Sequence, residues 1–353
     1  MEQRIIFSRN IKLELAEAIS ESEHDRIFVL SDTHTAQLCW PRISGFLSLK
    51  GARLLTIDAG DEAKNLDTLS YVWTQLRQGG ATRHSMLINL GGGMVTDLGG
   101  FAASTYKRGI NFINIPTSLL AMVDASVGGK TGINFGGLKN EVGVFNDSKF
   151  VIIDTHFLTS LDLQNLLSGY AEMIKHGLIS DEGTWASLMD FDITAPDFSQ
   201  MQVLVRQSVA VKERIVEADP CEKGLRKALN FGHTFGHALE EWSLSHAAPG
   251  SAPLLHGYAV AFGLICELWL SCTRCGFPVG RMRQTVSFIR SHYGDVNISC
   301  DDYDALVELM RHDKKNRAGE IDCTLLAGIG DVRTDQNLSE TEIKEAFDFL
   351  REG

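Results

Sequence analysis

The residues with the clearest potential for chemistry are histidines and one glutamate in the second half of the chain. His233 and His237 are four residues apart, so a helix would place both side chains on one face. His256 follows later, and Glu172 lies in a segment apolar enough to be buried. One carboxylate and two imidazoles leave a coordination position open for a substrate, as catalytic zinc requires. The alternative is packed helix histidines with a solvated glutamate, and spacing alone does not choose among His176, His233, His237 and His256.

A glycine turn in the first half suggests a nucleotide site. The apolar run 85–90 leads directly into Gly91, Gly92 and Gly93, and Asp97 follows soon after. A strand that runs into glycines and then into a helix presents backbone N–H groups to a pyrophosphate. The third glycine of the dinucleotide fingerprint is absent, because Thr96 occupies that position. A tight turn without a ligand is therefore the alternative.

Charged residues after two other apolar runs strengthen the nucleotide prediction. Asp32 follows the run 26–30, where a carboxylate could accept ribose hydroxyls, and Asp61 and Lys64 follow the run 53–57. Each of them could instead cap a helix or be an exposed charge. Ligands of parallel sheets bind at the carboxyl ends of the strands. The glycine turn and the charged residues after the other two runs therefore favour a dinucleotide together.

The elements that would position these groups are short strands that alternate with helices. Apolar runs predict strands at 26–30, 53–57, 85–90, 112–115 and 150–153, and helical spacing predicts a helix at 65–78. This alternation indicates a parallel sheet. From about Leu161 onward the pattern is helical, with helices predicted at 166–178, 201–218, 234–242, 258–272 and 303–311. We therefore expect an α/β half and a mostly α half that meet near residues 155–165.

Composition restricts the function classes. The chain has 353 residues, 44% of them hydrophobic, and a formal net charge of -12, which disfavours a nucleic-acid or anionic-membrane surface. The N-terminus has no apolar signal region, and the longest uncharged apolar stretch, 257–266, is far shorter than the ~20 residues of a bilayer span. Seven scattered cysteines, including the Cys272/Cys275 pair, suggest packed thiols in a reducing compartment. Together, these features predict a cytoplasmic enzyme without nucleic-acid or membrane partners.

Several segments, in this order, resemble the 3-dehydroquinate synthase family of sugar-phosphate cyclases. They span about residues 30–330, and the two most specific blocks are Asp-x-Ser-x-Gly-Gly-Lys at 124–130 and Gly-His-Thr-x-Gly-His at 232–237. The other matching segments are 91–97, 105–109, 116–120, 139–140, 171–175, 229–231 and 256–257. The resemblance implies an α/β N-terminal Rossmann-like domain that binds NAD, residues 1–160, and a mostly α-helical C-terminal domain that binds metal and substrate, residues 161–353.

The resemblance also assigns residues. It implies that Glu172, His233 and His256 bind Zn²⁺, or Co²⁺, and that His237 moves protons rather than binding the metal. The catalytic set it implies is Lys130, Lys175, His237, Arg108 and Asn140, and the substrate-binding set is Asp124, Lys139, Lys212, Arg226, Asn230 and Lys314, with Lys315 as the alternative to Lys314. The NAD-binding set is Asp32, Asp61, Lys64, Gly92, Gly93, Asp97, Thr117 and Ser118.

The chemistry that the resemblance implies is the conversion of 3-deoxy-D-arabino-heptulosonate 7-phosphate, a phosphorylated sugar acid, into 3-dehydroquinate and phosphate. Transient NAD-dependent oxidation is followed by β-elimination of phosphate, re-reduction and an intramolecular aldol closure. A substrate with a carboxylate and a phosphate needs several cations near it, which Lys and Arg side chains supply. A homodimer is compatible with the apolar segments of a two-domain chain.

Three features depart from the family pattern. Tyr258 stands where a glutamate is usual, Asp219-Pro220-Cys221-Glu222 replaces a more acidic run, and extra residues lie at 245–255. Three alternatives are a cyclase that makes an inosose or a valiolone, a metal-dependent polyol dehydrogenase that releases NADH, and a silent NAD-binding scaffold. The family's own reaction is favoured by the retention of Asp124, Lys130, Lys139, Asn140, Arg226 and Asn230.

Overall fold

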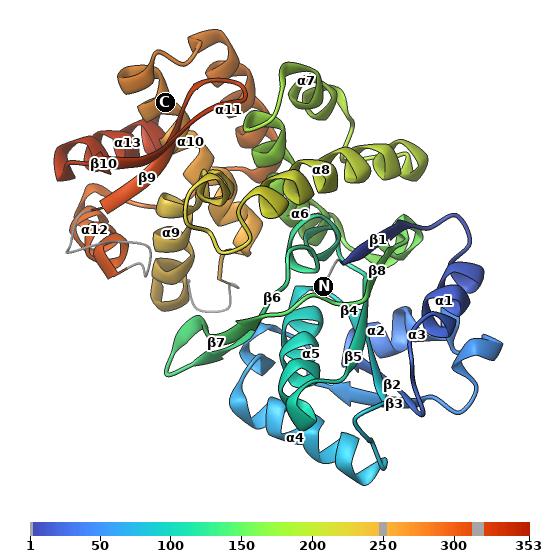
Figure 1. Ribbon diagram of the computed structural model, residues 1–353. Helices are drawn as coiled ribbons and strands as arrows, with labels where there is room; N and C mark the ends of the chain where they lie inside the picture. Colours follow the sequence, from blue (N-terminus) through green and yellow to red (C-terminus); the bar gives the residue numbers. More distant parts are fainter. Residues whose placement is uncertain (1–2, 247–252, 313–320) are drawn as a thin grey trace. The chain divides into compact units, whose positions relative to one another are not determined.

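A computed structural model describes residues 3–246, 253–312 and 321–353. The chain folds as two compact units (Figure 1). Unit 1 comprises Met1–Asp162 and Asp197–Val209, and unit 2 comprises Leu163–Pro196 and Ala210–Gly353. The helix α8, Phe198–Ala218, therefore contributes residues to both units.

Unit 1 is built on a parallel sheet of six strands in the order β1-β8-β5-β4-β2-β3 (Figure 1). These strands are β1 Arg4–Phe7, β2 Ile27–Asp32, β3 Arg53–Ile57, β4 Met86–Gly91, β5 Asn111–Pro116 and β8 Phe150–Ile153. All five predicted strands are confirmed, whereas β1 was not predicted. The central strand β4 is buried along its whole length, which is why it reads as an uninterrupted apolar run.

Helices follow the strands of unit 1, as a parallel sheet requires. They are α1 Ile11–Ser20, α2 Thr33–Leu38, α3 Trp40–Ile43, α4 Leu66–Gln78 and α5 Gly93–Thr105. Leu69, Val72 and Leu76 of α4 join Val95 and Leu98 of α5 in one apolar core with β2, β3 and β4. A second sheet, the hairpin of β6 Lys130–Phe135 and β7 Leu138–Phe145, packs through β6 against α5.

Unit 2 is mostly helical. Its helices are α6 Leu163–Leu178, α7 Glu182–Asp190, α9 His233–His246, α10 His256–Cys275, α11 Val279–Tyr293, α12 Tyr303–His312 and α13 Glu340–Glu352. A hairpin of β9 Ile321–Gly328 and β10 Asp331–Leu338 was not predicted, because β10 is mostly polar and half-exposed. The short helical turns of the chain are Leu47–Leu49, Asp61–Ala63, Tyr106–Arg108, Ala121–Ala125 (π-helical), Thr155–Ser160, Leu225–Asn230 and Cys300–Asp302.

Helix α10 is the central element of unit 2. It packs against α6, α9, α11, α13 and β9, and nearly every residue from Gly257 to Leu268 is buried. Among the described helices it is the one that is long and apolar enough to span a membrane, but 67% of its apolar window is buried inside the structure. A helix in the core of a globular protein can be equally long and apolar, so these properties of α10 are weak evidence for a membrane span.

Candidate active site

Three helices of unit 2 bring a carboxylate and two imidazoles together. Glu172 lies within α6, whereas His233 and His256 are the first residues of α9 and α10. The Nε2 atoms of both histidines lie 3.4 Å from Oε1 of Glu172. One potential ligand atom from each residue lies within 4.8 Å of the others, so the three can hold one metal ion.

The outer nitrogens of both imidazoles are occupied. Nδ1 of His233 lies 3.2 Å from the carbonyl oxygen of Phe231, and Nδ1 of His256 lies 3.1 Å from Oε2 of Glu240. With Nδ1 holding its proton in these contacts, loss of a proton from Nε2 gives the tautomer that binds metals, with its lone pair directed toward Glu172. Neither oxygen of the fully buried Glu172 has a hydrogen-bond partner of normal geometry among the described residues. This donor set fits a zinc ion.

Two glycines let the ligand-bearing helices approach each other closely. A Cβ atom on Gly257, next to His256, would lie 1.8 Å from the carbonyl oxygen of Ser168 in α6. A Cβ atom on Gly263 would lie 1.9 Å from the carbonyl oxygen of Gly232, which precedes His233. Because the obstructing atoms are backbone atoms, no side-chain rearrangement could relieve these contacts.

A buried carboxylate fixes the start of α9. Glu267 of α10 is 0% exposed and accepts hydrogen bonds from the backbone N–H groups of Gly232, at 2.6 Å, and Thr234, at 3.1 Å. These two groups flank His233. An acceptor at a helix N-terminus satisfies N–H groups that have no partner within the helix and is favoured by the helix dipole. Glu267 therefore holds the backbone that presents His233.

Two further predicted residues lie beside the three ligand candidates. The Nζ atom of Lys175, one turn after Glu172 in α6, forms an ion pair with Oε2 of Glu172. The ring centroid of His237 lies 5.3 Å from that of His233 and 6.1 Å from that of His256. His176 is buried in α6, four residues after Glu172. The grouping of Glu172, His233 and His256 thus leaves His237 as a neighbour of the cluster.

The charges of the cluster act on one another strongly. Burial raises the pKa of the Glu172 carboxyl, but attraction to Lys175 and His233 outweighs burial and holds this pKa well below its ordinary value. Burial lowers the pKa of His256, but the carboxylates of Glu240 and Glu172 outweigh it and raise this pKa to about 10. At neutral pH the metal-free protein therefore carries a proton on His256 that a metal ion has to displace.

Metal affinity is expected to depend on pH for this reason. Between about pH 6 and pH 8, displacement of one proton should strengthen zinc binding about tenfold for each unit of rising pH. Competition with a chelator of known pH dependence measures this slope. The Glu240→Gln variant should have a shallower slope, because it removes a carboxylate that holds the proton on His256. A wild-type affinity that does not change with pH would contradict the expectation.

The remaining predicted residues of unit 2 lie in α8 and in the turn before α9. Lys212 and Arg226 are buried cations, 6% and 2% exposed. Asp219 accepts from the backbone N–H groups of Lys223, Gly224 and Arg226 and so shapes the turn that carries Arg226. Nδ2 of Asn230 donates to Glu222 at 2.9 Å. Lys314 and Lys315 lie outside the described residues.

Tyr258, which departs from the family pattern, belongs to an aromatic contact. Its ring packs edge-on against Tyr293, with centroids 5.0 Å apart, and the hydroxyl of Tyr293 donates to the carbonyl oxygen of Leu167 in α6. The tyrosine beside His256 therefore links α10, α11 and α6. Of the extra residues at 245–255, those at 247–252 lie outside the described residues.

In unit 1, the glycine turn joins β4 to α5 as predicted. Gly92 precedes α5 without a side-chain cap, so the first N–H groups of the helix are not covered by a capping side chain. A Cβ atom on Gly92 would lie 3.3 Å from Oγ of Ser118, and one on Gly93 would lie 3.2 Å from Cβ of Ala125. Thr117 donates its backbone N–H to Gly91 at 2.9 Å. The predicted NAD-binding residues Gly92, Gly93, Thr117 and Ser118 thus lie together at the ends of β4 and β5.

A buried lysine, Lys64, contacts three other predicted residues of unit 1, and a fourth, Lys139, is connected to it through Asp61. The Nζ atom of Lys64, whose side chain is 6% exposed, lies 3.2 Å from Asp97, 3.4 Å from Asp61 and 2.6 Å from Oδ1 of Asn140. Lys139 pairs with Asp61 at 3.5 Å. Burial raises the pKa of Asp97 to about 6, although Lys64 partly opposes the shift. Residues predicted separately for NAD and for substrate therefore form one polar network.

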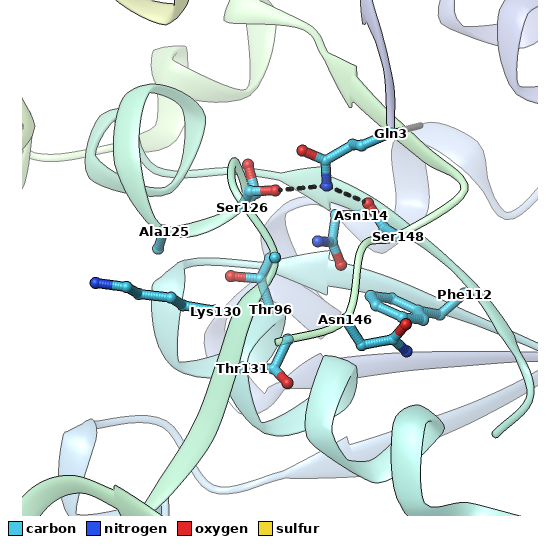
Figure 2. Close-up of a pocket in the computed structure, with 11 residues that line it drawn as sticks. Gln3, Thr96, Phe112, Asn114, Ala125, Ser126, Lys130, Thr131, Asn146 and Ser148 are labelled. Carbon is cyan, nitrogen blue, oxygen red and sulfur yellow. Dashed lines mark hydrogen bonds between the residues drawn. The ribbon is translucent and has the colours of Figure 1, made fainter. Parts of the chain in front are cut away.

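The other predicted residues of unit 1 have different surroundings. Asp32 caps α2 by accepting from the backbone N–H groups of His34 and Thr35, which is the alternative that its sequence position left open. Arg108 is exposed on a turn with a left-handed φ of 69° and has no polar partner among the described residues. Asp124 and Lys130 stand at the two ends of one loop, 124–130. Figure 2 shows Ala125, Ser126 and Lys130 of this loop.

Two further residues of the site, Glu240 and Glu267, were not predicted from the sequence. A signal existed for each of them. Glu240 is three residues after His237 and seven after His233, so it shares their helix face. Glu267 interrupts a long apolar segment, where an isolated carboxylate needs buried partners.

Comparisons with known proteins identify the family. The family model described as 3-dehydroquinate synthase N-terminal matches residues 54–168, and the model described as 3-dehydroquinate synthase C-terminal matches residues 169–316. A curated 3-dehydroquinate synthase of Parabacteroides distasonis is 52% identical over 351 residues, which cover 99% of this chain and 98% of that protein.

Solved structures share the fold. The structure of 2-epi-5-epi-valiolone synthase from Streptomyces hygroscopicus, with NAD⁺ and Zn²⁺ bound, has a TM-score of 0.87 at 26% identity and covers 99% of this chain and 97% of that one. A 2-deoxy-scyllo-inosose synthase has a TM-score of 0.85 at 23% identity, with 99% and 96% covered. Since both family models match adjacent regions and the curated relative aligns over nearly the full length, the chain belongs to the 3-dehydroquinate synthase family.

Proposed function

We propose that the chain converts 3-deoxy-D-arabino-heptulosonate 7-phosphate into 3-dehydroquinate and phosphate, and so acts as a carbon–oxygen lyase on a phosphate ester in the shikimate pathway. The observation that carries this proposal is the 52% identity, over nearly the whole chain, to a curated 3-dehydroquinate synthase. The valiolone and inosose synthases share only 26% and 23% of their residues with the chain.

We propose NAD and Zn²⁺, with Co²⁺ as the alternative metal, as cofactors. Glu172, His233 and His256 would hold the metal through the atoms that already face one another. When bound, the metal polarises a substrate hydroxyl as a Lewis acid, and NAD accepts a hydride and later returns it. Two related cyclases were solved with NAD⁺ and with Zn²⁺ or Co²⁺, which supports the assignment.

Beside the metal ligands, unit 2 would supply proton transfer and substrate binding. Lys175 is a suitable proton carrier, because its Nζ atom forms an ion pair with Glu172. His237 is a second one, because its ring lies next to the rings of His233 and His256. We assign Lys212, Arg226 and Asn230 to substrate binding, together with Lys314. Buried cations such as Lys212 and Arg226 suit the anionic groups of a sugar acid.

Unit 1 would bind NAD and hold the phosphate. The NAD-binding residues proposed are Asp32, Asp61, Lys64, Gly92, Gly93, Asp97, Thr117 and Ser118. Lys130 and Arg108 are assigned to the phosphate, with Lys139 near the same end of the substrate, and Asp124 and Asn140 are assigned to the rest of the substrate. Cations at the phosphate stabilise the charge that develops as the C–O bond breaks. The proton lost in the β-elimination is on C6, the carbon next to the transient ketone, and the departing phosphate can itself take it. The protein groups then mainly orient the substrate.

Other features of the proposal concern the whole chain. We propose that residues 1–160 form the NAD-binding domain and that residues 161–353 form the metal- and substrate-binding domain. The enzyme would work in the cytoplasm on a small phosphorylated sugar acid, without nucleic-acid or membrane partners, and a homodimer is the oligomeric state that we propose.

The test is a substrate panel. Purified, metal-loaded protein with NAD is incubated separately with 3-deoxy-D-arabino-heptulosonate 7-phosphate, sedoheptulose 7-phosphate and glucose 6-phosphate. The expected result is release of phosphate from the first substrate alone, together with one carbocyclic product. Turnover of sedoheptulose 7-phosphate or glucose 6-phosphate instead would identify a valiolone or an inosose synthase. Failure with all three would overturn the proposed reaction.

A further inference from the structure

The loop 124–130 begins in the π-helical turn Ala121–Ala125, ends at the first residue of β6, and contains two consecutive glycines in left-handed conformations, Gly128 at φ 94° and Gly129 at φ 70°. Val127 donates its backbone N–H to the carbonyl oxygen of Asp124 at 3.1 Å, and the backbone N–H of Asn146 donates to the carbonyl oxygen of Gly129 at 2.8 Å. These contacts leave Gly128 to be held by other groups. Glycine loses more conformational freedom on ordering than any other residue. The loop carries Asp124 at its start and Lys130 at its end, so its conformation determines where both side chains lie.

Gln3, more than 120 residues away in the sequence, uses its whole side-chain amide on this loop and its surroundings. Nε2 of Gln3 donates to the carbonyl oxygen of Ser126 at 3.2 Å and to the hydroxyl of Ser148 at 2.8 Å. Oε1 accepts the backbone N–H of Gly128 at 3.3 Å. Figure 2 shows the amide of Gln3 directed at Ser126 and Ser148. Both N–H groups and the oxygen of the Gln3 amide therefore form hydrogen bonds. Two of these three bonds are with backbone groups of the loop.

The sheet of unit 1 fixes the position of Gln3. The next residue, Arg4, begins β1, donates its backbone N–H to the carbonyl of Lys149 and pairs with Phe150 of β8. Ser148, the second acceptor of the Gln3 amide, directly precedes that segment and is 2% exposed. Gln3 therefore connects a rigid sheet edge to a glycine-rich loop.

We propose that Gln3 is a positioning residue, which holds the loop 124–130 in the conformation that binds substrate. This inference rests on the proposed function, because it takes Asp124 and Lys130 as substrate-binding residues. No sequence motif indicated a role for Gln3. The inference predicts that loss of the Gln3 contacts lowers the fraction of molecules in which the loop is ready to bind, whereas a bound substrate restores that conformation.

Two substitutions of Gln3 and a matched control test the proposal. Gln3→Ala removes all three contacts. Gln3→Glu keeps the shape and the acceptor for Gly128 but places a carboxylate against the Ser126 carbonyl, so it should be as harmful as alanine. Arg4→Ala is the matched control, because its guanidinium pairs with the exposed Glu21 and not with the loop.

The expected kinetic result is a change in KM without a matching change in kcat. If the loop occupies its binding conformation about one tenth of the time in Gln3→Ala and Gln3→Glu, KM for the phosphorylated substrate rises about tenfold. The kcat at saturation and the zinc content should stay at the wild-type level, and Arg4→Ala should match the wild type in all three quantities. Ser148→Ala should have a smaller effect that is not additive with Gln3→Ala, since both act through one contact.

Amide hydrogen exchange separates this inference from the proposed function. In Gln3→Ala, peptides that cover residues 126–130 should exchange about tenfold faster, and the strands of unit 1 should not. Unchanged exchange in the loop would overturn the inference, even if the enzyme is active. Faster exchange with an unchanged KM would overturn the positioning role. If wild-type protein does not turn over the substrate, the proposed function fails and the substrate role of Gln3 fails with it, while exchange still decides whether Gln3 braces the loop.

Discussion

Replacing Glu172 with glutamine is expected to abolish metal retention and to lower turnover by about 10³-fold or more. The Glu172 carboxylate is fully buried, and it faces the Nε2 atoms of His233 and His256 and the ammonium of Lys175. A neutral amide of the same shape provides no negative charge for a metal ion and leaves the Lys175 cation buried without its counter-ion. Metal content after dialysis and the rate of phosphate release measure the two effects.

Glu241→Gln is the control for this substitution, because it makes the same chemical change on an exposed carboxylate of α9. It should retain both the metal and the activity. If Glu172→Gln keeps a full complement of zinc and a wild-type rate, Glu172 is not a metal ligand and the site assignment is wrong.

The second large effect is expected at the glycines that let the three helices meet. Gly257→Ala forces a methyl group against the backbone of Ser168, and Gly263→Ala forces one against the backbone of Gly232. Either α10 moves away from its neighbours or the backbone is distorted, so we expect each variant to lose about 3 kcal/mol or more of unfolding free energy. Because His256 and His233 adjoin these contacts, zinc affinity should fall as well. Denaturant titration and zinc competition measure the two losses.

Gly280→Ala provides the comparison. Gly280 lies in α11 and is exposed, and a methyl group on its Cα would have no neighbouring atom within 4 Å. Alanine there should leave stability unchanged or raise it by up to about 1 kcal/mol, through helix propensity. If all three glycine variants behave alike, the close helix contacts do not control the assembly of the metal site.

The parallel sheet was predictable because its strands are buried. Such strands read as short apolar runs, as in β2, β4 and β8, and the intervening α4 carries apolar residues at helical spacing. The hairpins were not predictable in the same way. Every residue of β7 is exposed and β10 is mostly polar, so neither has a buried face that imposes a pattern on its sequence.

The candidate site was predictable only in part. Helical spacing indicated that His233 and His237 share a face, but it could not choose between them as ligands. That choice depends on how α6, α9 and α10 approach one another, and hence on backbone contacts at Gly257 and Gly263, which have no signature in residue spacing. The resemblance to the family supplied the choice of His233 and His256. Glu240, Glu267 and Gln3 were not predicted. The spacing of Glu240 and the apolar surroundings of Glu267 mark both carboxylates as unusual, but their roles depend on partners in distant segments. Gln3 has no such signal in the sequence.

We expect the reaction to be redox-neutral overall, with NAD reduced and reoxidised on the same molecule of substrate. The most direct measurement supplies NAD at a concentration far below that of 3-deoxy-D-arabino-heptulosonate 7-phosphate and follows phosphate, carbocyclic product and NADH together. We predict that phosphate and 3-dehydroquinate appear in equal amounts over many turnovers per NAD, without accumulation of NADH. Product that stops at one equivalent per NAD while NADH accumulates would contradict the claim and would indicate a polyol dehydrogenase.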